Sequence, residues 1–234
     1  MPVNGRDIRR ETLLSSSLFQ AMRPEELDAI LKAVTDRRYR RGQTIFTKDE
    51  EGSSMMAVLS GRVRIGAMSP DGKEITLNMI GAGEVFGEMA LLDGKPRSAD
   101  ATAFEDVHLL VIERRHFVPY LEGDKDLALR LLSVLCDRLR NTSETLSDFV
   151  MFDLPVRLGR TLIKLARDYG TPVGSGVRIG MKLSQNDLSR LVAATRESVN
   201  KQMRVWEDED LVAKEGGLLV VKNLDELKRQ SGVN

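Results

Sequence analysis

The sequence is poor in the residues that most metal and redox sites require. Among 234 residues there are one cysteine, Cys136, and two histidines, His108 and His116. A single cysteine excludes an intramolecular disulfide and a cysteine-ligated iron–sulfur cluster, and it suits a reducing compartment. Two histidines are a weak basis for a cupin-type metal enzyme or a haem sensor. Since no nucleophile–base constellation is present either, we expect no metal and no enzymatic activity.

Charge imbalance and long apolar runs are also missing. The 35 Lys and Arg residues balance 35 Asp and Glu residues, so any basic surface for nucleic acid must be local. No apolar run reaches the ~18 residues of a membrane span. The first twelve residues lack the apolar core of a secretory signal. We therefore expect a cytoplasmic protein with no membrane partner.

The N-terminal half alternates short apolar runs with glycines from Asp36 to about Ile112. Such runs, spaced about ten residues apart, are typical of an antiparallel sandwich or jelly roll. Residues 69–72, Ser-Pro-Asp-Gly, predict a hairpin turn. Before this region, after an exposed start, residues 18–34 predict two short helices with Pro24 at a first helical position. The predicted strands lie at 42–46, 55–59, 61–68, 74–80 and 108–112.

A long helix is predicted from Asp124, which can cap it, to Phe149. It would be ~39 Å long at 1.5 Å per residue, more than a small β-roll needs. Its apolar residues step by three and four, as in the seam of a coiled coil, and a polar Thr142 interrupts the seam. These features favour a two-fold dimer, with Cys136 as a small buried residue beside the seam. The seam consists of Leu132, Leu135, Leu139, Thr142, Leu146 and Phe149.

The C-terminal third predicts a second, mainly helical unit after a hinge at residues 149–155. A flexible loop is expected at 170–176, followed by two helices separated by a tight turn. Ser184 with Asp187 forms a capping signature for the first helix, and Thr195 can cap the second. Further on, a wing-like hairpin around Gly216 and Gly217 and a short helix at 224–230 are predicted. The helix pair would share a core of Leu188, Leu191, Val192, Val199, Met203 and Trp206.

Residues 86–103, FGEMALLDGKPRSADATA, suit a small anion that carries a ribose. Gly87 lets the backbone approach closely, and Glu88 can accept a hydrogen bond from a ribose hydroxyl. Arg97 offers a planar fork to phosphate oxygens, and Ser98 adds a hydroxyl. The amides at the start of the short helix, those of Glu88, Met89 and Ala90, can point at the anion.

The second helix of the pair is a candidate for reading DNA. Between Arg178 and Arg204 there are six Lys and Arg residues and two Asp and Glu residues, so this stretch is locally basic. Arginine can read guanine, and glutamate can accept from cytosine N4. The acidic residues 207–210 would repel phosphate, so only the start of the helix can approach DNA. Its exposed side chains there are expected to be Arg196, Glu197, Asn200 and Lys201.

Taken with these motifs, the chain from about Leu18 to Leu227 resembles the cyclic-AMP receptor branch of the Crp/Fnr regulators. The resemblance rests on three stretches: the segment at 86–103, which is similar to the phosphate-binding cassette of cyclic-nucleotide-binding domains, and residues 138–166 and 183–212. It implies an α+β protein with a cyclic-nucleotide-binding β-roll at 1–123. A dimerisation helix and hinge at 124–152 and a winged helix-turn-helix at 153–234 would follow.

The resemblance also implies roles for individual residues. Thr142 would contact the purine within its own subunit and Ser143 from the partner subunit. The cassette residues Gly87, Glu88, Met89, Ala90, Arg97 and Ser98 would hold the ribose and cyclic phosphate. The DNA-binding set would comprise Ser184, Thr195, Arg196, Glu197, Asn200 and Lys201.

Two positions depart from the pattern of that family. Lys201 stands where an arginine is usual, which puts a point charge in place of a fork at the inner bases of a TGTGA-like half-site. Ala193 replaces a frequent turn glycine, which we expect to cost little stability.

The predicted function is a transcription regulator in which a cyclic nucleotide favours a homodimer that binds palindromic DNA. Cyclic AMP is favoured because a hydroxyl can accept from the adenine amine. Cyclic GMP remains open, because a hydroxyl can donate to guanine O6 and Ser98 could meet guanine N2. RNA polymerase is expected as a further partner. The alternative is an orphan regulator of the same family that is not gated by a cyclic nucleotide.

Overall fold

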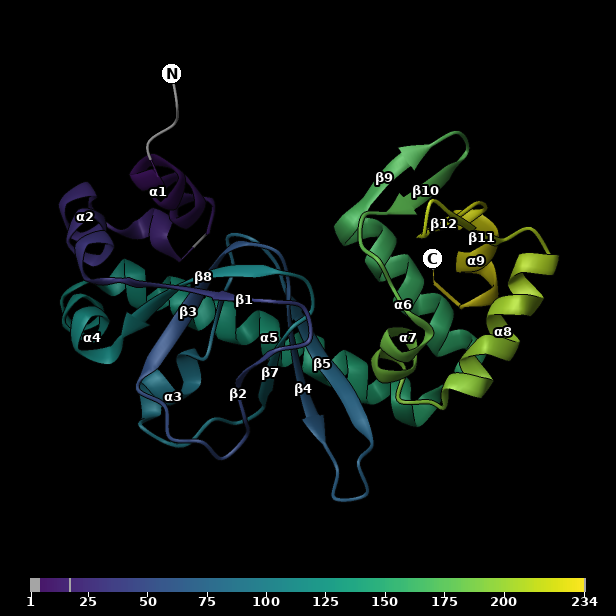
Figure 1. The fold of residues 1–234 in the computed structure, drawn as a ribbon, viewed down its shortest axis with the longest axis horizontal. Coiled ribbons are helices and arrows are strands. Elements are labelled where there is room, and N and C mark those ends of the chain that lie inside the picture. The colour runs from purple at the N-terminus through teal and green to yellow at the C-terminus, as the bar shows by residue number, and fades with distance from the viewer. Residues whose placement is uncertain (1–4, 17, 234) are drawn as a thin grey trace. The chain divides into compact units, whose positions relative to one another are not determined.

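A computed structural model describes residues 5–16 and 18–233, and the chain divides into two compact units (Figure 1). The first comprises Met1–Gly72 and Leu77–Thr142, and the second comprises Lys73–Thr76 and Ser143–Asn234. Each unit has a core of its own and is described by itself.

The first unit contains two four-stranded sheets whose recorded strand pairs are antiparallel, which confirms the predicted β-roll. Their strand orders are β1-β8-β3-β6 and β2-β7-β4-β5. The edge strand β1 and the short β6 and β7 were not predicted, because TDRRY and DATA show no apolar alternation. Gly72 N donates to Ser69 O at 2.9 Å, which confirms the predicted turn. The strands are β1 (Thr35–Tyr39), β2 (Thr44–Phe46), β3 (Ser54–Ser60), β4 (Val63–Met68), β5 (Glu74–Ile80), β6 (Val85–Phe86), β7 (Asp100–Ala103) and β8 (Val107–Glu113).

Strand β3 shows why the roll needs apolar residues on both faces of one sheet. Successive side chains of a strand point to opposite faces. Met55 and Ala57 therefore join the cluster formed with the helices, whereas Met56 and Val58 join the cluster shared with the other sheet. A continuous apolar run is the expected signature of such a doubly covered strand.

The helices of this unit cover one side of the roll. The expectation of an exposed N-terminal start was wrong for its described part, because α1 lies there and Leu13 is buried in the core. The helix was not predicted because five of its eleven residues, GRDIRRETLLS, are charged and only three are large and apolar. Pro24 does begin α2, as predicted. The elements are α1 (Gly5–Ser15), the 3₁₀ helix η1 (Phe19–Ala21), α2 (Pro24–Ala33), α3 (Glu88–Asp93) and α4 (Arg114–Gly123).

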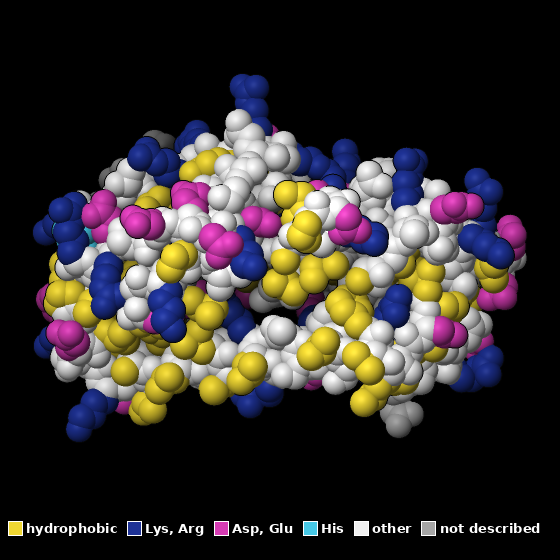
Figure 2. Space-filling view, turned by 90° about the horizontal axis from the view of Figure 1, so that it is seen from below, with side chains coloured by type: hydrophobic (Ala, Val, Ile, Leu, Met, Phe, Trp, Pro, Cys, Tyr) yellow, Lys and Arg dark blue, Asp and Glu magenta, His cyan; other side chains and the backbone are white. Residues whose placement is uncertain are grey.

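The long helix α5 (Lys125–Met151) confirms the predicted element. Its cap is Asp124, whose Oδ1 accepts from Asp126 N at 2.9 Å and Leu127 N at 3.1 Å. Several of its large apolar side chains are exposed to solvent. Figure 2 shows hydrophobic side chains, in yellow, on the surface of the protein. Cys136 was expected to be buried but is exposed in this chain, because it lies on a side of α5 that the described protein leaves uncovered. The exposed large apolar residues of α5 are Leu129, Leu132, Leu139, Leu146, Val150 and Met151.

The second unit is a four-stranded sheet, in the order β11-β12-β10-β9, packed with helices. The flexible loop expected at 170–176 was wrong, because these residues form most of a hairpin that turns at Gly174 with φ +57°. Three glycines, a proline and a serine in this stretch suggest a loop. The stretch is extended instead because β9 pairs with β10, which in turn pairs with β12. The elements are α6 (Leu154–Tyr169), β9 (Gly170–Val173), β10 (Gly176–Ile179), α7 (Gln185–Leu191), α8 (Arg196–Asp208), β11 (Val212–Glu215), β12 (Leu218–Val221) and α9 (Leu224–Gln230).

The helix pair and the wing are confirmed. The core shared by α7 and α8 forms as predicted, except that Leu191 is only half-buried. The wing β11–β12 turns through Gly216 and Gly217, at φ +59° and +80°, values that glycine adopts without strain. The fully buried members of the core are Leu188, Val192, Val199, Met203 and Trp206.

Candidate nucleotide and DNA sites

The predicted cassette is a tight strand–turn–helix. Strand β6 ends at Phe86, Gly87 turns the chain at φ +75°, and α3 follows until Gly94 at φ +70°. A Cβ at Gly87 would lie 2.6 Å from Arg97 Nη1. Glycine is therefore required at position 87 both by the backbone conformation and by the close approach of an arginine.

The Arg97 side chain is buried beneath this turn, with 5% of the residue exposed. Its Nη1 donates to Ser54 O at 2.7 Å and Gly87 O at 2.8 Å, and its Nη2 donates to Ser54 Oγ at 3.2 Å. These acceptors are all neutral, and Arg97 Nε is buried without a partner. Burial lowers the pKa of Arg97, while the negative charges of Glu50 and Glu88 raise it. The site thus holds a desolvated positive charge with donor capacity to spare.

Glu88 is also buried, but it has a charged partner. The residue is 1% exposed, and its carboxylate forms an ion pair with Arg138 of α5, whose guanidinium also donates to Val85 O. Its second oxygen, Oε2, is buried without a hydrogen bond. Arg138 was not among the predicted site residues. The available signal was its position four residues before Thr142, which places the two on one face of the helix.

The remaining predicted nucleotide residues differ in exposure. Ser98 is exposed, and its Oγ donates to Met89 Sδ at 3.5 Å, while Ala90 is buried. Thr142 and Ser143 are exposed on α5. The structure therefore brings Gly87, Glu88 and Arg97 together, and the contacts expected of Thr142 and Ser143 stay predictions.

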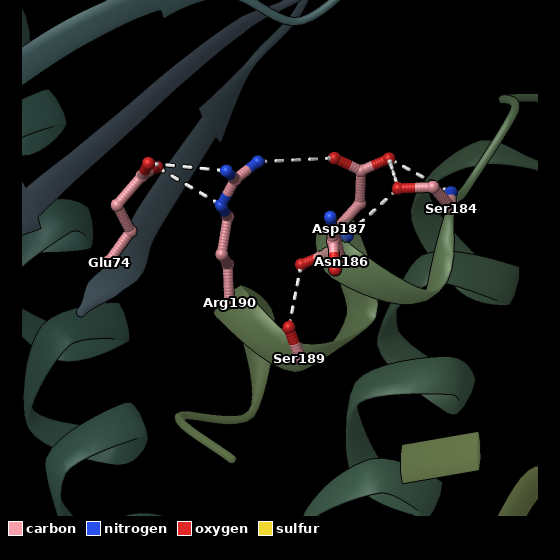
Figure 3. A network of polar contacts seen from close by, with 6 residues as sticks. All are labelled: Glu74, Ser184, Asn186, Asp187, Ser189 and Arg190. Carbon is pink, nitrogen blue, oxygen red and sulfur yellow. Dashed lines mark hydrogen bonds and ion pairs between the residues drawn. The ribbon is translucent and has the colours of Figure 1, made fainter. Parts of the chain in front are cut away.

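In the second unit, α7 begins with the predicted capping box (Figure 3). Ser184 Oγ accepts from Asp187 N at 3.1 Å, and Asp187 Oδ2 accepts from Ser184 N at 2.9 Å. Arg190 lies between Asp187, at 3.9 Å, and Glu74, at 3.0 Å. The capping box fixes the start of α7.

The α8 helix presents the predicted reading side chains. Thr195 caps it by accepting from Ser198 N at 3.1 Å. Arg196, Glu197 and Lys201 are exposed, while Asn200 is half-buried. Their partners on α8, including Val199 and Trp206, hold the opposite face in the core.

The turn before α8 contains a strained residue. Ala193 has φ +48°, in the left-handed region that costs an L-residue roughly 1–2 kcal/mol. Its cost is therefore larger than the small effect expected from the sequence.

The two histidines lie among ordinary polar contacts. His108 Nε2 is 2.6 Å from Asp36 Oδ1, and His116 Nε2 accepts from Arg115 Nε at 3.1 Å. Within residues 5–16 and 18–233, no group of three or more His, Cys, Asp or Glu residues could hold a metal ion. The same part of the chain contains no helix long and apolar enough to cross a membrane.

A buried arginine beneath a glycine turn, on a β-roll, and a winged helix-turn-helix define a ligand-responsive transcription regulator. Residues 36–124 match the model of the cyclic nucleotide-binding domain, and residues 156–230 match that of the Crp-like helix-turn-helix domain. The chain belongs to the Crp/Fnr family of transcription regulators.

Curated relatives and solved structures agree with this assignment. The chain is 31% identical over 221 residues to the CRP-like cAMP-activated global transcriptional regulator of Mycobacterium tuberculosis, covering 94% of this chain and 99% of the relative. It is 31% identical over 207 residues to the cyclic AMP receptor protein of Thermus thermophilus, covering 88% and 93%. A CooA mutant from Carboxydothermus hydrogenoformans superposes with a TM-score of 0.73 at 25% identity, covering 86% and 88% of the two chains.

Proposed function

We propose that this regulator is gated by a purine cyclic nucleotide, with cyclic AMP the preferred ligand and cyclic GMP a second candidate. The observation that carries the proposal is the Arg97 guanidinium, which is buried with neutral acceptors and an unpartnered Nε. A buried charge whose hydrogen-bond acceptors are all neutral is costly, and a bound anion would compensate it. Gly87, Glu88, Met89, Ala90 and Ser98 would complete the phosphate and ribose site.

The purine would lie against α5. Thr142 in one subunit and Ser143 in the partner would offer hydroxyl groups, which accept from the adenine amine or donate to guanine O6. The apolar face of α5 would form the homodimer interface, with residues 124–152 as dimerisation helix and hinge. Relatives named as cAMP-activated regulators support this choice of ligand.

The DNA-binding part would be residues 153–234, with α8 in the major groove. Arg196, Glu197, Asn200 and Lys201 would meet base edges, and Ser184 and Thr195 at the helix starts would lie near phosphates. In a two-fold dimer the recognition helices would read half-sites about one duplex turn, ~34 Å, apart. The target is then a palindrome of TGTGA type, and RNA polymerase is a further expected partner.

Gating requires that the nucleotide bind one dimer arrangement more tightly than another. The hinge could transmit a change in α5 to the DNA-binding part, because polar contacts make the hinge stiff. Arg160 forms an ion pair with Asp148 at 3.0 Å, and Arg157 Nη1 donates to Phe152 O at 3.2 Å. These contacts bridge the end of α5 and the start of α6.

The test is titration of the full chain with cyclic AMP and cyclic GMP by calorimetry, with binding to a TGTGA-like palindrome as a second readout at fixed salt. Arg97→Leu should lose about 2–5 kcal/mol of nucleotide binding, whereas Lys95→Ala, an exposed cation nearby, should bind as the wild type does. DNA binding that is equal with and without either nucleotide would establish the orphan alternative instead.

A further inference from the structure

The guanidinium of Arg97 lies on an aromatic ring. Arg97 Cζ is 4.3 Å from the centroid of Phe46 on β2. Phe46 is itself 7% exposed, and Phe86 packs against it with ring centroids 5.8 Å apart. The ring therefore has little freedom to move, and it gives the guanidinium a fixed plane to lie on.

A glycine, Gly52, also lies directly against the Arg97 guanidinium. An ideal Cβ built on Gly52 would lie 2.4 Å from Arg97 Nε and 2.6 Å from Arg97 Cζ. Gly52 does not have a positive φ, so its backbone conformation admits any L-residue. A side chain at position 52 would thus meet the Arg97 side chain, which would have to move, whereas Gly87 is required by its backbone conformation as well.

Three hydrogen bonds complete the placement. Ser54 and Gly87 accept from the two terminal nitrogens of Arg97, so the guanidinium cannot slide within its plane without losing an acceptor. Nε, the nitrogen nearest to Gly52, is the one left buried without a partner. The Phe46 ring, the space left by Gly52 and the three hydrogen bonds together determine the position of the Arg97 guanidinium.

We propose that Phe46 and Gly52 are positioning residues for phosphate recognition: they fix the plane and depth of the Arg97 guanidinium. This inference rests on the proposed binding of a cyclic nucleotide by Arg97. A guanidinium recognises phosphate oxygens through a directed fork, so a displacement of about 1 Å weakens binding strongly. Neither residue has a side chain with a hydrogen-bond donor or a charge for phosphate, so their proposed side-chain effect acts through Arg97.

The sharpest test adds one methyl group. Gly52→Ala should reduce affinity for cyclic AMP by about tenfold or more, because the methyl displaces the guanidinium. Gly123→Ala adds the same methyl where no atom lies within 4 Å and should leave affinity unchanged. The decisive readout is the affinity ratio of the two cyclic AMP phosphorothioate diastereomers, which put sulfur on one or the other exocyclic oxygen. Gly52→Ala should change that ratio, and an unchanged ratio overturns the proposal.

A second variant removes the ring. Phe46→Leu should reduce cyclic AMP affinity roughly 3- to 30-fold, as expected for loss of a desolvated cation–π contact, and should also change the diastereomer ratio. Leu109→Ala removes apolar volume from the same core cluster and should leave the ratio as in the wild type. If Leu109→Ala shifts the ratio equally, general loosening of the core suffices, and Phe46 has no positioning role.

Nuclear magnetic resonance separates this inference from the proposed function. In the free protein, the Nε–H signal of Arg97 should be slowly exchanging and shifted by the Phe46 ring. The ring shift should vanish in Phe46→Leu, and the signal should move in Gly52→Ala but not in Gly123→Ala. A wild-type chain that binds neither nucleotide overturns the proposed function, and the spectra still decide whether Phe46 and Gly52 hold Arg97. Wild-type spectra without the ring shift overturn the inference whatever the binding result.

Discussion

At the scale of single residues, two buried charges in the cassette have opposite surroundings. Glu88 is paired with Arg138, while Arg97 is surrounded by neutral acceptors. Burying a charge is tolerable when a partner compensates it, and breaking such a pair leaves the desolvation cost uncompensated. Removing one partner of the pair would therefore destabilise the free protein, whereas an arginine with only neutral acceptors is suited to an anionic ligand.

Arg138→Leu should accordingly destabilise the protein by about 3–5 kcal/mol, because Glu88 would remain buried without its counter-charge. Chemical denaturation measures this loss. Arg140→Leu, two residues further along, breaks an exposed pair with Asp137 and should change stability by less than about 0.5 kcal/mol. Equal effects of the two substitutions would contradict a special role for the buried pair.

At the turn residue Ala193, by contrast, a substitution should increase the stability of the protein. The Ala193 φ of +48° is unfavourable for alanine, so Ala193→Gly should raise stability by roughly 0.5–1 kcal/mol. Thermal unfolding should show a higher midpoint. Ala194→Gly provides the control, since Ala194 has no positive φ and its replacement should lower the midpoint. A lower midpoint for Ala193→Gly would mean that the strain is relieved in solution.

At the scale of elements, α5 is buried at its start and carries an exposed apolar stripe further along. Leu127 and Leu131 anchor its start in the core of the first unit. Further along, the exposed fractions of Leu132, Leu139 and Leu146 are 55%, 68% and 62%. These residues recur every seven positions, which is the spacing of a coiled-coil seam. In a monomer this apolar stripe would be exposed to water, so we expect a second copy of the chain to cover it.

Leu139→Glu should disrupt the proposed dimer, because two carboxylates would face each other across the seam. Analytical ultracentrifugation should show monomer at concentrations where the wild type is dimeric. Ser133→Glu adds the same charge at an exposed position off the seam and should leave the dimer intact. A dimeric Leu139→Glu protein would place the interface elsewhere.

The start of α2 should contribute an acid-dependent part of stability. A side-chain hydrogen bond from Arg23 lowers the pKa of Glu26. A lowered folded pKa gives stability that is present above the unfolded value, about 4.3, and lost as pH falls through the folded value. Glu26→Gln should therefore be less stable than the wild type at about pH 6, with the difference shrinking towards about pH 3.

At the scale of the whole molecule, the proposed function links a nucleotide site and a DNA-reading helix through α5 and the hinge. Arg196→Ala should cost about 1–3 kcal/mol per half-site and relax the preference at one guanine. Lys201→Arg should sharpen the inner half-site, because a fork replaces a point charge. Both effects should appear only with nucleotide bound, measured on a TGTGA-like palindrome at fixed salt.

Two outcomes would contradict this picture in different ways. An unchanged site preference in Arg196→Ala would remove α8 as the reading helix. Effects that are equal with and without cyclic nucleotide would leave α8 in place but remove the gating.

Much of this protein was determined by local sequence. Gly87 and Gly94 take left-handed conformations that their residue type permits, and Asp124, Ser184 and Thr195 cap the helices they precede. Turns and caps depend on a few neighbouring residues, so the cassette, the long helix and the helix-turn-helix could be predicted from the chain alone.

Only the tertiary structure decided which distant residues meet. Arg138 pairs with Glu88, and Phe46 and Gly52 enclose Arg97, across separations that no local pattern encodes. The exposure of Cys136 and the hairpin at 170–179 likewise depend on what packs or pairs with these segments. Residue type sets the chemistry that a position can perform, whereas burial and neighbours, which folding alone provides, set the charge and geometry with which it acts.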